Sequence, residues 1–248
     1  MPRAKLSVTI VAQDEEDRLE PAIRSVEWAD EVLVVDGGST DRTAELARDA
    51  GARVVDHPWQ GYAAQKNVAR ARATHDWVLG LDADERVSPE LAASIRGALA
   101  DPGDHHGFAC NRRNHYLGRP IRWCGWYPDR RVRLFHREHA AWVGPDPHDT
   151  VDVDGSVGPL DGDLLHDSYR SVADHRRSIE RLASSWAASA AADGRRTRPW
   201  DLTLRPAGHF LKNYLLRLGF LEGRNGVLIC AMGALHVFTK YRELGRTR

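Results

Sequence analysis

The first hundred residues alternate between short apolar runs and stretches with helical periodicity. The runs are rich in β-branched side chains, which predicts buried strands at 6–12, 31–36, 52–56 and 76–82. The stretches between them repeat apolar positions every three or four residues, which predicts helices at 17–28, 41–50, 61–73 and 88–100. Strands and helices joined by such short connections are typical of an α/β protein, in which helices cover both faces of a mostly parallel sheet.

The pattern changes after residue 100, where Gly, Pro, His and Trp become more frequent. The apolar runs there predict short strands at 107–111, 131–135 and 150–153. A helical stretch with little strong apolar periodicity follows at 167–192, and two further helices are predicted at 199–220 and 226–241. We therefore expect one domain over residues 1–165, with halves at 1–100 and 101–165, followed by a helical extension over 166–248.

Composition narrows the class of protein. Of the 248 residues, 42% are hydrophobic and 28% are charged, as in a folded globular protein. The net charge is zero, which argues against a general nucleic-acid binder. Residues 1–100 nevertheless carry 18 acidic and 12 basic side chains, whereas residues 193–248 carry 4 acidic and 11 basic ones. This segregation predicts different partners for the two ends of the chain.

The three cysteines, Cys110, Cys124 and Cys230, show no CxxC spacing. Neither a zinc site nor a disulfide framework is therefore expected, and a reducing compartment fits. The N-terminal apolar run is short and soon followed by acidic residues, unlike a signal peptide. No run reaches the roughly 20 apolar residues that span a bilayer.

Acidic residues follow the predicted strands at the edge where parallel sheets bind ligands. Asp82 and Asp84 are two positions apart in an extended segment, so their carboxylates point to the same side. Such a pair suits a hard divalent ion, Mg²⁺ or Mn²⁺, shared with a diphosphate, although a solvated acidic turn would have the same sequence. Asp36 precedes Gly37-Gly38 and suits a contact to a ribose or base, or a helix-capping turn. The GxGxxG dinucleotide fingerprint does not occur here.

These segments together resemble family 2 glycosyltransferases of GT-A fold. The resemblance rests on the motif DGGSTDRT, on the apolar strand that ends in DAD, and on the stretch around QDEED, within residues 6–100. Three later segments, at 111–137, 164–171 and 210–226, resemble the WaaE-like branch of lipopolysaccharide core glycosyltransferases. That branch transfers a β-1,4-linked glucosyl group to a lipid-linked core sugar.

The resemblance implies a role for several residues. Residues 1–100 would bind a nucleotide-sugar donor such as UDP-glucose, and residues 101–165 would bind the acceptor. The implied donor-binding residues are Asp14, Glu15, Asp36, Lys66, Asp82, Arg130 and Arg131, although a solvated edge strand would also explain the two arginines. Asp84 would ligate the metal, and His166 would support the site. Asp149 would be the catalytic base beside His148, although the family has Glu at this position and an acidic turn residue would explain Asp149 equally well.

A direct transfer with inversion needs one base on the attacking side and a cation at the leaving diphosphate. The basic amphipathic tail fits contact with the inner face of the cytoplasmic membrane, where a lipid-linked saccharide acceptor would lie. Helix packing within the chain or a homodimer interface would give the same pattern. Two other functions stay open: a nucleotidyltransferase that forms nucleotide sugars, and a catalytically inactive nucleotide-sugar-binding scaffold.

Overall fold

The computed structural model describes residues 3–146 and 149–246, which belong to two compact units. The first unit contains the residues up to 112 together with 129–166. The second unit contains residues 113–128 and the chain from 167 onward. Each unit is therefore built from two separate stretches of sequence.

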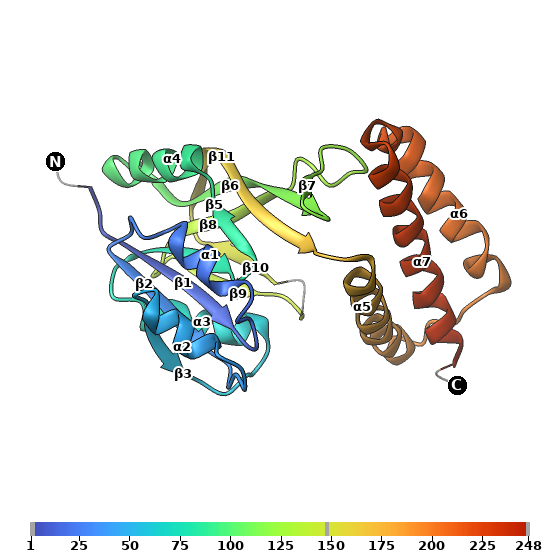
Figure 1. The fold of residues 1–248 in the computed structure, drawn as a ribbon, viewed down its shortest axis with the longest axis horizontal. Coiled ribbons are helices and arrows are strands. Elements are labelled where there is room, and N and C mark those ends of the chain that lie inside the picture. Colours follow the sequence, from blue (N-terminus) through green and yellow to red (C-terminus); the bar gives the residue numbers. More distant parts are fainter. Residues whose placement is uncertain (1–2, 147–148, 247–248) are drawn as a thin grey trace. The chain divides into compact units, whose positions relative to one another are not determined.

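The first unit is organised around a mixed sheet with parallel strands at one side (Figure 1). Strand β1 pairs in parallel with β2 and β4, and β2 pairs in parallel with β3. Strand β8 continues the sheet antiparallel to β4, and β6 is antiparallel to β8. The order is β3-β2-β1-β4-β8-β6-β11-β5. The strands are β1 (Leu6–Ala12), β2 (Glu31–Asp36), β3 (Arg53–Asp56), β4 (Trp77–Asp82), β5 (Glu85–Val87), β6 (His105–Tyr116), β8 (Arg130–His136) and β11 (Ser156–Tyr169).

Helices cover both faces of the sheet, as the strand–helix alternation predicted. Leu6, Val8 and Ile10 of β1 point to the face that carries α1, α2 and α4. Val11 points to the opposite face and packs against Ala69 of α3. The helices are α1 (Leu19–Arg24), α2 (Thr43–Asp49), α3 (Tyr62–Arg72) and α4 (Pro89–Ala100). Alternate side chains of the buried strand thus fill two separate cores.

Local capping signals explain where the helices begin. The Ser88 hydroxyl accepts a hydrogen bond from the Leu91 amide at 3.2 Å, and Pro89 occupies the first turn of α4. Helix α1 is shorter than the predicted 17–28, because Asp14 adopts a positive φ of 54° and the chain runs as turns up to residue 18.

The segment after residue 100 contains more strand than its sequence indicates. β6 and β11 have 12 and 14 residues, and a hairpin of β9 (Ala140–Val143) and β10 (Thr150–Val153) follows β8. The pattern of β11 is interrupted by Gly162, which has a φ of +86°. A Cβ there would lie 2.4 Å from the Leu91 amide nitrogen, so the position requires glycine.

The second unit consists of helices and the segment 113–128, which includes β7 (Arg119–Pro120). Its helical elements are α5 (Val172–Ala192), η1 (Pro199–Leu202), α6 (Leu204–Leu211), η2 (Lys212–Leu216), η3 (Gly219–Glu222) and α7 (Arg224–Arg246). The single helix predicted over 199–220 is therefore wrong, since α6 continues into a π-helical turn and Leu218 then adopts a φ of 53°. In the described parts of the chain, no helix has both the length and the hydropathy needed to cross a bilayer.

Candidate active site

The turn after β2 is held together by Asp36. Its carboxylate accepts hydrogen bonds from the Gly38 and Ser39 amides at 3.1 and 3.0 Å, and from the Ser39 hydroxyl. Asp36 is buried at the carboxyl end of the parallel strands. This carboxylate therefore fixes the DGGS turn, and its predicted contact with a nucleotide remains a prediction.

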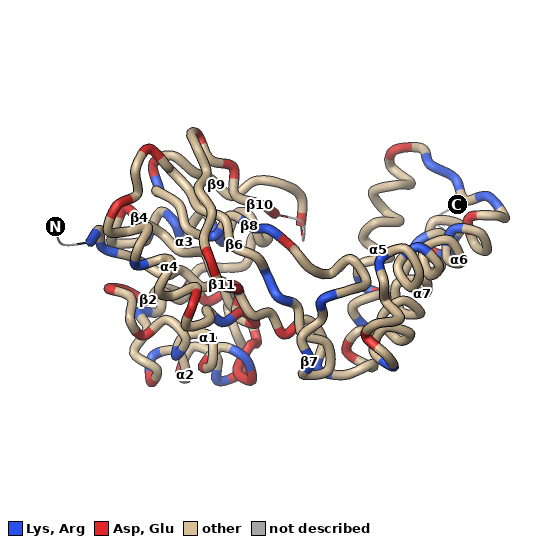
Figure 2. Tube along the Cα trace, turned by 90° about the horizontal axis from the view of Figure 1, so that it is seen from above, with Lys and Arg blue, Asp and Glu red and all other residues tan. Residues whose placement is uncertain are grey.

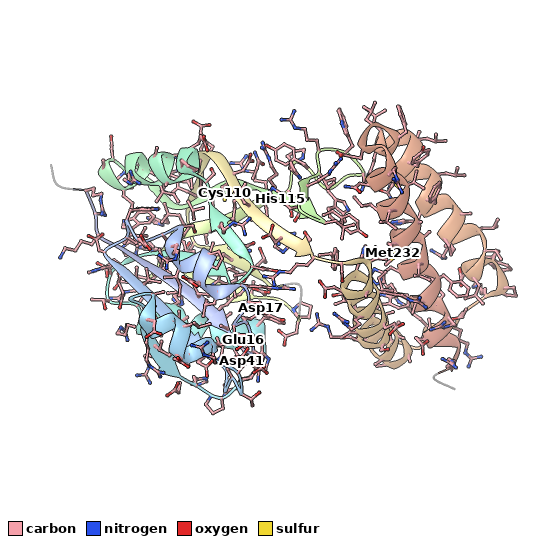
Figure 3. The ribbon with its side chains drawn as sticks, in the orientation of Figure 1. Glu16, Asp17, Asp41, Cys110, His115 and Met232 are labelled. Atoms are coloured by element: carbon pink, nitrogen blue, oxygen red, sulfur yellow. The ribbon has the colours of Figure 1, made fainter. Side chains whose placement is uncertain are left out.

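The loop after β1 is tied to the same turn. Asp14 accepts a hydrogen bond from the Thr40 amide at 2.7 Å, and the Glu15 amide donates to the Thr43 hydroxyl at 2.8 Å. The Glu16 amide donates to Asp41 at 3.2 Å, and Figure 3 shows these two residues close together. The two loops therefore form one connected wall at the end of the sheet.

Lys66 joins two acidic residues that are far apart in the sequence. Its Nζ lies 2.7 Å from Oδ1 of Asp82, at the end of β4, and 2.9 Å from Oδ2 of Asp149, just before β10. The Lys66 side chain is 8% exposed, and its ammonium lies 4.5 Å from the ring centroid of Trp142. The structure thus brings together three residues that the sequence singled out separately. His148 lies outside the described residues.

A buried arginine completes the charge balance around Asp82. Arg133 of β8 lies 2.9 Å from Asp82 and 2.7 Å from Glu85, which is fully buried. Burial alone would raise the pKa of Asp82, but Lys66 and Arg133 outweigh it and hold that pKa well below its usual range. Asp82 is therefore an ionised carboxylate shared by two cations.

Asp84 has different surroundings from Asp82. Its Oδ2 lies 3.3 Å from Nε2 of His166 in β11 and 3.6 Å from the Arg18 guanidinium. A carboxylate oxygen and an imidazole nitrogen at this separation are suitable donors for one divalent ion. Among the described residues, no group of three or more His, Cys, Asp or Glu side chains is arranged to hold a metal. The Asp84 carboxylate suits Mg²⁺ or Mn²⁺, which take much of their coordination from phosphates and water, whereas the His166 imidazole is a donor better suited to transition metals.

The β9–β10 hairpin is anchored over this site by side chains from other elements. The Asn67 side chain donates to the Trp142 carbonyl at 2.8 Å and accepts from the Trp142 amide at 3.0 Å. Gly80 makes room for the indole, because a Cβ there would lie 2.6 Å from a Trp142 ring atom. Asp146 accepts a hydrogen bond from the Tyr62 amide at the start of α3. These contacts fix Trp142 of β9 and Asp146 against β4 and α3.

The residues around Lys66 line one cleft in the first unit. Its lining is Lys66, Asp82, Arg112, Arg131, Val132, Arg133, Trp142, Asp149, Thr150 and Val151. Asp129 holds both Arg112 and Arg131 through contacts of 2.8 and 2.9 Å. Of the two arginines predicted to bind phosphate, Arg131 lines the cleft, whereas Arg130 is exposed and is not among its described lining residues.

Several residues of the site were not singled out from the sequence, among them Glu85, Arg112, Arg133 and Trp142. A signal for Arg133 existed, because side chains two apart on a strand share a face and Arg131 had been selected. Glu85 directly follows the DAD motif. Trp142 gave no comparable signal, since its role depends on the space left by a glycine on another strand.

Comparisons with known proteins identify the family and the fold of the chain. The model of glycosyl transferase family 2 matches residues 7–151. The lipopolysaccharide core biosynthesis glycosyltransferase LpsC of Rhizobium meliloti is 31% identical over 252 residues, which cover 96% of this chain and 91% of LpsC. An uncharacterized glycosyltransferase of Rickettsia typhi is 31% identical over 97% of this chain and 87% of its own length. A mycobacterial protein of known crystal structure covers 74% of each chain with a TM-score of 0.50 and 21% identity.

The fold and the site define a glycosyltransferase with the GT-A architecture. The chain belongs to glycosyl transferase family 2, as the resemblance in its sequence predicted.

Proposed function

We propose that this enzyme transfers a sugar, glucose in the first instance, from a UDP-linked donor to a saccharide of the lipopolysaccharide core or another lipid-linked acceptor. The observation that carries the proposal is the Lys66 bridge, which sets the carboxylate of Asp149 beside that of Asp82 in one cleft. In a direct displacement, the base contacts the acceptor hydroxyl while the donor is bound next to it. The base and the donor-binding group must therefore lie close enough to contact the same pair of reacting sugars. Family membership and the match to LpsC over most of both chains support the reaction class.

Asp149 is the proposed base. It removes the proton of the acceptor hydroxyl as that oxygen bonds to the anomeric carbon, and the bond from this carbon to the diphosphate oxygen breaks. The result is one displacement with inversion. Lys66 contacts Asp149 at 2.9 Å and holds it in position, and Asn67 fixes Trp142 of β9 beside it.

Asp84 is the residue proposed to ligate Mg²⁺ or Mn²⁺ through its carboxylate, and His166, 3.3 Å away, is proposed to support it. The ion, when bound, stabilises negative charge on the leaving diphosphate. Arg131, with Arg112 behind it, supplies further positive charge to the same cleft. Asp14, Glu15 and Asp36 form the proposed wall for the nucleoside.

The lipid-linked acceptor would place the enzyme at the inner face of the cytoplasmic membrane as a peripheral protein. The match to a lipopolysaccharide core enzyme supports this location and the acceptor class. The sugar itself is the least constrained part of the proposal, since a different hexose requires small changes in the cleft. A screen of UDP-, GDP- and ADP-linked sugars is therefore the first assay.

The metal-site prediction is tested with Asp84→Ala. We expect turnover of the donor with Mn²⁺ to fall at least about a hundredfold, because charge on the leaving group loses its stabilising ion. Product formation is followed by UDP release, and Mn²⁺ binding is measured separately by electron paramagnetic resonance. EDTA should abolish turnover by the parent enzyme, and added Mn²⁺ should restore it.

The matched control is Asp56→Ala, which removes an exposed carboxylate at the end of β3, a strand that β2 and β1 separate from β4 in the same parallel part of the sheet. It should leave both turnover and Mn²⁺ binding unchanged. Asp149→Asn should bind donor and Mn²⁺ normally but transfer poorly. An Asp84→Ala enzyme that keeps its metal dependence and its rate would contradict the proposed site.

A further inference from the structure

The second unit exposes a run of large apolar side chains that no described part of this unit covers. They are Leu204, Leu211, Leu215, Leu216, Leu218, Phe220, Leu221 and Val227. Leu216 is 80% exposed and Leu204 is 70% exposed. Soluble proteins expose single apolar residues routinely, but this many exposed large apolar side chains within 24 residues indicate an interaction surface.

The helical segment formed by α6 and η2 has two apolar faces with different surroundings. Phe210 and Tyr214 pack against the cluster around Ile229 and Cys230 of α7. Leu211 and Leu215, one position further along, lie on the side turned to solvent. The inner face thus packs α6 against α7. The apolar side chains of the outer face make no contribution to that packing.

A neighbouring segment extends the exposed surface. The Arg122 and Trp123 amides donate to one Glu222 carboxylate oxygen at 2.7 and 2.9 Å, which fixes the 122–123 turn against η3. Trp123 is itself exposed. An indole beside exposed leucines is suited to the boundary between headgroups and acyl chains.

The charge of this region is almost entirely positive. Residues 204–227 contain Arg205, Lys212, Arg217 and Arg224 but a single acid, Glu222, whose carboxylate is engaged as above. Residues 113–128 add three arginines and no acid. Figure 2 shows Lys and Arg segments recurring near β7, α6 and α7. Basic side chains around an apolar surface complement an anionic lipid headgroup layer.

We infer that Leu204–Val227, together with Arg122 and Trp123, form a docking surface for an anionic phospholipid bilayer. The leucines and aromatic rings enter the interface, and the surrounding arginines and Lys212 contact lipid phosphates. This inference deepens the proposed function, on which its biological meaning rests, because it names the surface that would bring the enzyme to a lipid-linked acceptor. The binding itself requires no sugar transfer.

The test is co-sedimentation of the full chain with vesicles of phosphatidylcholine alone and of phosphatidylcholine mixed with phosphatidylglycerol. The parent protein should bind the anionic vesicles and release them as salt rises. The double variant Leu211→Gln/Leu216→Gln should bind them about tenfold more weakly, since two apolar side chains no longer enter the interface. Lys212→Gln/Arg122→Gln should weaken binding to the anionic vesicles selectively.

The matched control is Val172→Gln, which changes an exposed apolar residue at the start of α5 and should leave vesicle binding unchanged. Equal binding by the parent protein and the leucine variant would overturn the inference. The inference would also be overturned if analytical ultracentrifugation showed the parent protein as a dimer and the leucine variant as a monomer, and neither protein bound vesicles. Donor turnover measured without vesicles separates the two proposals. If only the docking surface is lost, the leucine variant still turns over the donor. If the proposed function is wrong, neither the parent protein nor the variant turns over the donor, but the parent protein still binds vesicles.

Discussion

Lys66 occupies the position on which the charge balance of the cleft depends. Burial lowers its pKa, but contacts with Asp82 and Asp149 outweigh that effect and raise it. The ammonium therefore stays charged at any physiological pH. Without it, Asp82 would keep Arg133, whereas Asp149 would lose its ion pair with Lys66 and, among the described residues, no other cation is recorded in contact with it.

Replacing this lysine distinguishes charge from shape. Lys66→Met should reduce kcat at least about a hundredfold, because the base Asp149 loses the 2.9 Å ion pair that holds it in place. Lys66→Arg keeps the charge and should retain a larger share of the activity. Steady-state kinetics at varied donor concentration measure kcat and KM for each variant. Equal losses of kcat in the two variants would show that the size of the side chain matters and its charge does not.

At the scale of single residues, the sequence predicts which residue types belong to the site but not which of them contact one another. Asp82, Asp84 and Asp149 were selected because carboxylates at strand ends or in a family motif suit this chemistry. The pairing of Asp84 with His166, and of Lys66 with Asp149, depends on residues 82 and 83 positions away, respectively. Local sequence pattern carries no information about contacts between residues so far apart in the chain. The site residues could therefore be predicted, but the ion pairs that connect them could not.

Among the elements, β2 begins with a side chain that ties four segments together. Glu31 accepts hydrogen bonds from the Ser7 hydroxyl of β1, from Arg53 of β3, and from both the amide and the hydroxyl of Thr74, after α3. Burial raises its pKa, but these donors outweigh burial and lower it from 4.5 to about 2. The parallel half of the sheet is therefore stabilised by an ionised carboxylate.

The stability contributed by Glu31 should depend on pH. Because its pKa is lower in the folded state, the contribution is complete above pH 4.5 and is lost as the pH falls toward about 2. A shift of this size corresponds to about 3 kcal/mol in the free energy of unfolding. Urea denaturation of the parent protein and Glu31→Gln should therefore differ most at neutral pH and converge on acidification.

The exposed Glu20→Gln serves as the control and should follow the parent protein at every pH. A constant difference between the parent and Glu31→Gln across the acidic range would show that the carboxylate acts through packing and not through its charge.

The bounds of β1 and β2 agree with the predicted strands, because each strand comes from an uninterrupted run of largely apolar, mostly buried residues. The failures fall where tertiary contacts override local pattern. β11 carries Pro159 and Gly162 and several acidic residues, yet it forms a strand because neighbouring strands supply its partners. The predicted helix at 199–220 is apolar enough for one helix, but Leu218 turns the chain so that Gly219 packs against Cys124 and Cys230.

On the scale of the whole molecule, the notable feature is the composition of the second unit. Residues 113–128 include the last four residues of β6 and the segment that follows it, belong to the second unit, and contribute Tyr116, Ile121 and Cys124 to a core with Ile229 and Cys230. Sequence proximity alone assigns this segment to the sheet domain. Its true partners lie about a hundred residues later, as the 106-residue separation of Cys124 and Cys230 illustrates.

This arrangement predicts the outcome of a truncation after residue 166. The shortened chain retains the candidate site but exposes Tyr116 and Ile121, which are fully buried in the intact protein. We expect it to bind a hydrophobic dye such as ANS and to aggregate, because exposed apolar clusters of this size drive association. A second truncation, in which residues 117–126 are replaced by a short Gly-Ser linker and Tyr116 by Ser, should be more soluble. Size-exclusion chromatography and ANS fluorescence compare the three proteins. If the simple truncation is monomeric and does not bind ANS, the segment 113–128 does not depend on the C-terminal helices.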